Sequence, residues 1–143
     1  MSDRDALLRA SDLIVLTTVA ATPHILDGSL LAHNPLVLNI SLRDLAPEIL
    51  LGAHNIVDDV EHVMQANSSP HLAEQLSGGR AFVNGTLAAL MTGACAVDRS
   101  KPIVFSPFGL GILDLAVGKW IHDLAVEAGE AIEIEHFFHD LTR

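Results

Sequence analysis

Leu13-Ile14-Val15-Leu16-Thr17-Thr18 is the stretch of sequence that decides the fold. These six residues are apolar or β-branched and have the length of a β-strand. Their apolarity is continuous rather than alternating, which is typical of a strand that is covered on both faces in a parallel sheet. The sequence therefore predicts an α/β protein built around this strand.

Further segments of the same kind alternate with helical segments along the chain. This alternation predicts right-handed crossovers and a mainly parallel sheet flanked by helices, in a single domain over residues 1–143. The last long helix is apolar on more than one face, so we expect it to be buried against the sheet or against another chain. We expect strands at 36–40, 55–59, 102–105 and 131–135, and helices at 3–11, 29–32, 47–51, 60–75 (in two pieces), 84–91 and 109–128.

The composition excludes several classes of partner. The net charge is −10 with only 8 Lys and Arg residues, whereas nucleic acids and anionic membranes need clustered cations. The longest uncharged stretch, 81–97, is too short and too polar to span a membrane. Half of the residues are hydrophobic, and a monomer of this size cannot bury the apolar surface of them all. This surplus predicts an oligomer or a complementary partner segment.

The single cysteine, Cys95, allows no disulfide within the chain and predicts a reducing, cytoplasmic location. The first residues contain no basic run that leads into an apolar stretch, so no secretory signal is visible. Cys95 lies among Ala, Gly and Thr, a context typical of a small buried side chain rather than of a nucleophile.

Ligands of open parallel sheets bind outside the carboxyl ends of the strands. The segments at those positions are 17–20, 41–44, 58–59 and 106–109. Among them Asp44 is placed where an acid or base would act, and a surface ion pair with Arg43 or a helix cap are its alternatives. Asp58 and Asp59, with Glu61, form either a Mg²⁺ site or the polar start of the next helix.

Two further motifs carry weaker signals. Gly109 and Gly111 open a helix after a strand, but the third glycine of a phosphate-binding fingerprint is replaced by Asp114, so we expect a tight turn here and no phosphate. Of eight histidines only His136 and His139 have ligand-like spacing. Neither a cysteine partner nor a His-Glu-x-x-His motif accompanies them. We therefore predict no metal site, with histidines that are solvated or cap helices.

Four stretches, 10–18, 38–44, 55–59 and 98–112, resemble the C-terminal half of the ornithine cyclodeaminase/μ-crystallin family. The resemblance implies a Rossmann-like half domain and spans nearly the whole chain. Residues 38–45 and 105–114 are most similar to the branch that makes 2,3-diaminopropionate for siderophores and peptide antibiotics. The enzyme of that branch uses NAD to oxidatively hydrolyse N-(2-amino-2-carboxyethyl)-glutamate to 2,3-diaminopropionate and 2-oxoglutarate.

The resemblance also implies roles for individual residues, with NAD as cofactor and a small amino acid as substrate. Asp44 matches the catalytic aspartate near the substrate nitrogen. The family's GxGxxG turn, its ribose-binding acid and its carboxylate-binding Arg and Lys precede the part that matches this chain, which implies a complementary N-terminal half or a homo-oligomer. The implied cofactor-binding residues are Thr18, Val19 and Ala20 in the groove, Ile40 and Ser41 beneath the nicotinamide, and Ser106, Phe108 and Gly109 over its ring.

Two alternatives remain open at this stage. The chain is a catalytically silent oligomer or binding module derived from that family. Or it is a different enzyme on the same scaffold, in which Asp44, with Asp58, acts on a small amine or imine.

Overall fold

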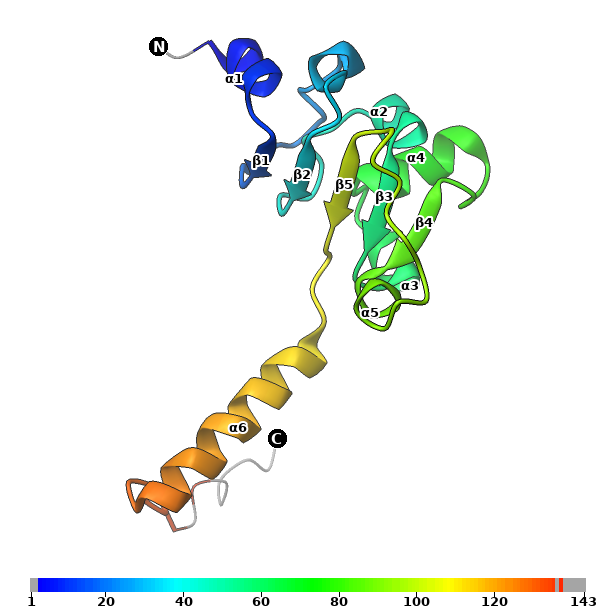
Figure 1. Ribbon diagram of the computed structural model, residues 1–143. Helices are drawn as coiled ribbons and strands as arrows, with labels where there is room; N and C mark the ends of the chain where they lie inside the picture. The colour runs from blue at the N-terminus through cyan, green and yellow to red at the C-terminus, as the bar shows by residue number, and fades with distance from the viewer. Residues whose placement is uncertain (1–2, 136, 138–143) are drawn as a thin grey trace. The chain divides into compact units, whose positions relative to one another are not determined.

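The computed structural model describes residues 3–135 and 137, which fall into two compact units, Met1–Gly109 and Leu110–Arg143. The first unit is built on a five-stranded sheet in the order β1-β2-β5-β3-β4, and every neighbouring pair of strands is parallel (Figure 1). This confirms the predicted α/β class and the parallel sheet. The strands are β1 (Leu13–Leu16), β2 (Leu36–Asn39), β3 (His54–Val57), β4 (Val83–Thr86) and β5 (Ile103–Ser106).

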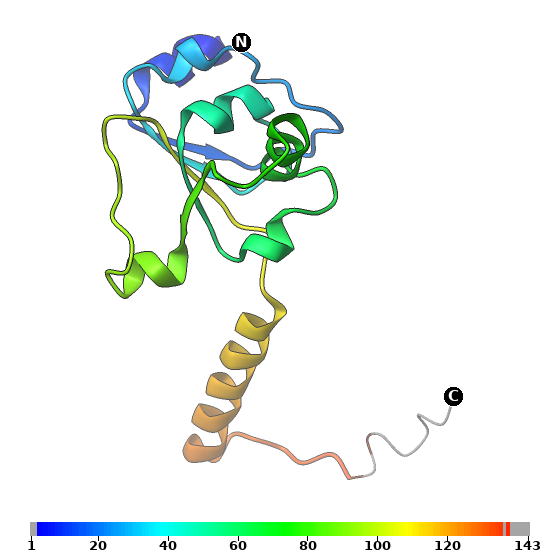
Figure 2. The same cartoon turned by 90° about the vertical axis from the view of Figure 1, so that its right-hand side faces the viewer.

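One face of the sheet carries the main core. Val37 of β2 and Val104 of β5 are fully buried there, against apolar side chains of the helices. Figure 2 shows α1, α2 and α4 gathered on one side of the strands and α5 on the other. The helices of this unit are α1 (Arg4–Ala10), η1 (Gly28–Leu31, 3₁₀), α2 (Pro47–Gly52), α3 (Val60–Val63), α4 (Ser69–Ser77) and α5 (Leu87–Met91).

The helix ends follow from capping residues in the sequence. Asp3 accepts hydrogen bonds from the first backbone N–H groups of α1, and Ser68 does the same for α4. Pro47 begins α2, where its missing N–H leaves no helical bond unmade. Gly78 ends α4 in the left-handed conformation that glycine adopts without strain.

The opposite face is open along β1. Ile14 is 7% exposed, but its neighbour Val15 on the other face is 53% exposed, and Leu13 and Leu36 are also exposed. The prediction that this strand is covered on both faces is therefore wrong within residues 3–109, because the described helices that pack on β1 lie on one side of it. Among the described residues β1 pairs with β2 alone, so the other edge of β1 has no strand partner there.

Three local predictions are wrong. Residues 83–86 form an edge strand rather than the start of a helix, because the Asn84 side chain accepts the backbone N–H of Asn55 and Val83 pairs with β3. Residues 131–134 have no regular structure, although their alternating pattern is strand-like. β3 ends at Val57, so Asp58 and Asp59 follow the strand rather than ending it.

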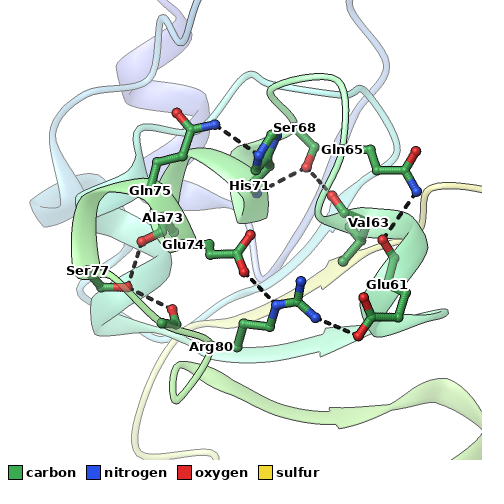
Figure 3. Close-up of polar contacts among 11 residues, drawn as sticks. Glu61, Val63, Gln65, Ser68, His71, Ala73, Glu74, Gln75, Ser77 and Arg80 are labelled. Atoms are coloured by element: carbon green, nitrogen blue, oxygen red, sulfur yellow. Dashed lines mark hydrogen bonds and ion pairs between the residues drawn. The ribbon is translucent and has the colours of Figure 1, made fainter.

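A network of polar contacts fixes the turn between α3 and α4 (Figure 3). Arg80 donates to Glu61 at 2.6 Å and to Glu74 at 2.5 Å, which links the two helices. Ser68 donates to the carbonyl of Val63 and accepts from the N–H of His71. The turn between these anchors is therefore held in one shape.

The second unit is dominated by α6 (Gly111–Ala128), which ends at Gly129 in the left-handed conformation. Taken by itself, the helix exposes the apolar side chains of Ile112, Leu115, Trp120 and Ile121. That the sheet or another chain buries these side chains stays a prediction. Across the described residues, none of the helices has both the length and the apolarity of a membrane span.

Candidate functional site

The predicted site segments meet at one edge of the sheet. Because β1, β2, β5 and β3 are consecutive neighbours and parallel, the residues that follow them all emerge at the carboxyl edge. This places the segments 17–20, 41–44, 58–59 and 106–109, with Asp44 among them, along one side of the first unit, as the sequence predicts.

Asp44 is the most buried polar group at this edge, with an exposed fraction of 0%. Its two carboxylate oxygens accept hydrogen bonds from the hydroxyls of Thr18 and Ser41, each at 2.5 Å. The interpretation of Asp44 as a surface ion pair is therefore wrong, and so is that of a helix cap, since Ala46 precedes α2. A buried carboxylate that receives two hydroxyl donors fixes the direction of both hydroxyls.

His24 is the third side chain at this carboxylate. Its Nε2 lies 3.4 Å from Asp44 Oδ1, and its side chain is 37% exposed. Arg4 lies on the other side, with Nη1 3.4 Å from His24 Nδ1 and 3.1 Å from the His24 carbonyl oxygen. Because arginine only donates, Arg4 can approach His24 Nδ1 only as a hydrogen-bond donor. His24 thus contacts both the buried Asp44 carboxylate and the Arg4 guanidinium.

Asn39 and Ser106 lie side by side at the ends of β2 and β5. Both are buried, and the Asn39 amide donates to the Ser106 hydroxyl at 3.2 Å. The Asn39 oxygen is buried without a hydrogen-bond partner among the described residues. This places an unused acceptor beneath the carboxyl edge, close to the segments predicted to hold a cofactor.

Asp58 anchors the loop that follows β5. One of its oxygens accepts the backbone N–H groups of Phe108, at 2.9 Å, and Gly109, at 2.7 Å. Gly109 has a φ of 101°, which favours glycine at this turn. The carboxylate thus occupies the donors that an anionic ligand would use, and it shapes the loop instead.

The described residues contain no group of three or more His, Cys, Asp or Glu side chains arranged to hold a metal ion. Asp59 caps α3 by accepting the N–H of His62, and Glu61 pairs with Arg80, so the acidic cluster is the polar start of a helix. His136 and His139 lie outside the described residues. Cys95 packs beside Gly85, where an added Cβ would lie 2.7 Å from the sulfur.

A hollow of about 350 Å³ opens at the end of β1, a size within the range of small-molecule sites. Three of the predicted cofactor residues line it, whereas Ser41 and Ser106 are buried and Ile40 and Phe108 are exposed on the neighbouring loops. The structure therefore brings the predicted residues to one edge without joining them all in one pocket. The hollow is lined by Thr18, Val19, Ala20, Ala21, Leu42 and Arg43.

Sequence reasoning missed the contributions of His24 and Arg43. His24 meets Asp44 from 20 residues away, and no local pattern indicates that contact. Arg43 was visible next to Asp44, but it pairs with backbone carbonyls rather than with a carboxylate. Both sets of contacts become visible only when the folded chain brings these loops together.

The sequence matches no family model and no curated protein. Among solved structures, the chain is similar to CmnK, with a TM-score of 0.81 and 28% identity over 96% of this chain and 42% of that one. It is also similar to Thermococcus litoralis Δ1-pyrroline-2-carboxylate reductase, solved with NADH and L-proline, with a TM-score of 0.82 and 18% identity over 94% of this chain and 44% of that one.

An archaeal alanine dehydrogenase dimer with bound NAD gives a TM-score of 0.79 and 23% identity over 95% of this chain and 44% of that one. A probable ornithine cyclodeaminase from Bordetella pertussis Tohama I is a further structural neighbour. The chain thus has the fold of a part of these NAD-dependent and cyclodeaminase-like enzymes. It spans between 42% and 44% of the length of each of the four.

Proposed function

We propose that this chain forms the nicotinamide-side wall of an NAD-dependent amino-acid oxidoreductase of the ornithine cyclodeaminase type. The observation that carries the proposal is the buried, hydroxyl-bonded Asp44 at the carboxyl edge of a parallel sheet, beside a hollow of ligand size. The same fold in enzymes solved with NADH or NAD supports the cofactor.

The residues at the edge fit the flat end of NAD better than its phosphates. Val19, Ile40 and Phe108 expose apolar surface on three neighbouring loops, which suits a nicotinamide ring. Asp58 already occupies the two backbone N–H groups of the loop after β5, so that loop offers no cradle for an anion. The pyrophosphate therefore needs groups from another polypeptide segment.

The roles proposed for individual residues follow from this fit. Thr18, Val19 and Ala20 line the cofactor groove, Ile40 and Ser41 lie beneath the nicotinamide, and residues 106–109, with Ser106, Phe108 and Gly109, close over it. When bound, NAD accepts a hydride from a C–H group next to an amine. Asp44 supplies the fixed negative charge near the substrate nitrogen and favours the protonated amine or imine there.

The supporting argument for a complementary half comes from the sheet. The free edge of β1 and the exposed Leu13, Val15 and Leu36 are what a sheet presents when further strands and helices belong beside it. Residues 1–143 would then be the C-terminal half of a cytoplasmic, Rossmann-type domain whose GxGxxG half is a separate segment. The substrate of the 2,3-diaminopropionate branch, N-(2-amino-2-carboxyethyl)-glutamate, is the one we propose.

The experiment is an activity assay of the chain alone and of the chain mixed with the part of CmnK that this chain does not match. NADH formation is followed with the proposed substrate, alanine, proline or ornithine. We expect activity only on mixing, and loss of that activity in Asp44→Asn. Activity that is unchanged in Asp44→Asn would refute the role of this residue, both here and in an enzyme repurposed for a small amine or imine.

A second candidate is a catalytically silent homo-oligomer, favoured by the same exposed apolar side chains on β1 and α6. In that case copies of the chain cover these surfaces for one another. Light scattering coupled to size exclusion separates the two candidates, because a monomer that binds NADH contradicts the silent oligomer.

A further inference from the structure

We propose that the apolar hollow beside α5 binds an aliphatic monocarboxylate, with its hydrocarbon chain against the outer face of the sheet and its carboxylate on the guanidinium of Arg99. The hollow has a volume of about 310 Å³, at the lower end of the range of small-molecule sites. It shares no lining residue with the hollow at the end of β1, so this inference goes beyond the proposed function.

The floor of the hollow is the outer face of three parallel strands. Leu38 of β2, Phe105 of β5 and Ile56 of β3 are register partners, so their side chains form one apolar row across the sheet. Leu36 and Ile103 form a second row beside it. The floor is therefore a continuous apolar surface, which suits an aliphatic chain.

The walls of the hollow are α5, on the opposite side of the sheet from α1, α2 and α4, and the loop that follows α5 (Figure 2). Leu87 and Leu90 of α5 line the hollow. The loop is tied back to this helix, because the N–H groups of residues 94 and 95 donate to the carbonyl of Ala89 at 2.8 and 3.2 Å. The walls are held in place before a ligand arrives, which lowers the entropic cost of binding.

Arg99 is the polar member of the lining and is free to bind an anion. It is exposed, and it makes no hydrogen bond or ion pair within residues 3–135 and 137. The adjacent carboxylate of Asp98 is occupied by the turn itself, since one oxygen accepts the Ser100 N–H at 2.9 Å and the Ser100 hydroxyl at 2.6 Å. The hydroxyl first, and the N–H next, lower the pKa of Asp98. Arg99 thus keeps its five N–H donors for a ligand.

The charge in the lining selects a ligand with a single negative group. A guanidinium binds a planar carboxylate through two parallel hydrogen bonds, and the apolar residues around Arg99 suit the chain behind it. A second negative charge would meet no further cation in the lining of a protein whose net charge is −10. An ammonium group in the same place would face Arg99 with like charge.

The first test uses the ¹⁵N-labelled full chain and three probes below their micelle concentrations: hexanoate, octanoate and n-octylamine. We expect octanoate to shift the backbone amides of β2, α5, β5 and residues 97–99. Hexanoate should bind about tenfold more weakly, because each methylene contributes about three- to fourfold in affinity. At pH 7 octylamine has the same chain and the opposite charge, so it should also bind at least about tenfold more weakly than octanoate.

Two outcomes of this test would overturn the proposal. If octanoate shifts none of these amides, the hollow is not a site for such a ligand. Equal affinity for octanoate and octylamine would show an apolar surface that does not recognise a carboxylate.

The second test uses variants whose folding is checked by their own ¹⁵N spectra. Arg99→Met is expected to weaken octanoate binding by about tenfold and to abolish the preference for octanoate over octylamine. Lys101→Met removes an exposed cation two residues away and is the matched control, which should keep that preference. Leu87→Ser shortens a wall and should weaken both probes alike. An unchanged preference in a folded Arg99→Met would refute the proposal, and Arg99→Gln serves as a second variant if Arg99→Met does not fold.

The remaining alternative is that a second copy of the chain covers the hollow. In that case octanoate would compete with self-association, and its apparent affinity would fall as the protein concentration rises, a result that would overturn the proposal. An affinity that is independent of protein concentration supports it. These titrations need neither NAD nor turnover, so failure of the proposed function leaves this test intact.

Discussion

Strand β1 allows a quantitative prediction of stability, because two adjacent residues on it face different environments. Ile14 lies in the core at 7% exposure, and Val15 is 53% exposed on the open face. Ile14→Ala is expected to destabilise the chain by about 2–5 kcal/mol, the usual cost of truncating a buried aliphatic side chain to alanine. Val15→Ala removes two methylene equivalents that are about half buried, so the expected loss is about 1 kcal/mol.

The assay is urea unfolding followed by circular dichroism, at several protein concentrations. The contrast between the two variants should persist on dilution if the open face of the isolated chain is free. Equal losses for Ile14→Ala and Val15→Ala at low concentration would show that this face is already covered. That result would refute the argument that the face awaits a complementary half.

Three further predictions concern other parts of the fold. Gly85→Ala should cost about 1–3 kcal/mol, because the new Cβ would lie 2.7 Å from the Cys95 sulfur, and adding Cys95→Ala should recover most of that loss in urea unfolding. Asp58→Ala removes the oxygen that accepts both the Phe108 and the Gly109 N–H, so hydrogen exchange at the Phe108 amide should accelerate about tenfold or more. The pKa of Asp27 is lowered by the hydroxyl and then the N–H of the residue two positions on, so its stabilisation is present above its ordinary value of 3.8 and is lost as the pH falls through the lowered pKa. Asp27→Asn should therefore flatten the acid limb of the thermal melting profile.

Controls and contrary outcomes are available for each of these. Gly79→Ala meets no atom within 4 Å and should change stability by less than about 0.5 kcal/mol. A Gly85→Ala loss that persists with Cys95→Ala would locate the strain elsewhere. Unchanged exchange at Phe108 would show that Asp58 does not hold the loop, and an unchanged acid limb would contradict the contribution of Asp27.

The sequence predicted the sheet well, because its strands are short apolar runs that tertiary contacts reinforce. β4 was missed because Asn84 and Gly85 disfavour a strand locally, and only pairing with β3 and the Asn84 side-chain contact stabilise it. The continuous apolarity of β1 was correctly identified as a strand, but one of its faces has no cover within residues 3–109. The apolar pattern of a strand shows that both of its faces suit burial, but it does not show which part of a protein covers them.

The position of the candidate site could be predicted from the sequence, but the contacts among its side chains could not. Strand ends alone located Asp44, since parallel strands carry their ligands at one edge. The complete burial of Asp44 and its contact with His24 depend on the path of the segment that follows β1 and carries His24. No rule of residue spacing predicts that path. The role of Arg43 depends on the left-handed turn at Ala66, which lies 23 residues further along the chain.

The most direct test of the central claim is an NADH titration of the ¹⁵N-labelled chain. We predict shifts confined to the carboxyl edge of the sheet, at the amides of residues 18–20, 40–41 and 108–109. An absence of shifts at saturating NADH, or shifts centred on the apolar hollow beside α5 that Leu38, Leu87 and Phe105 line, would contradict the account.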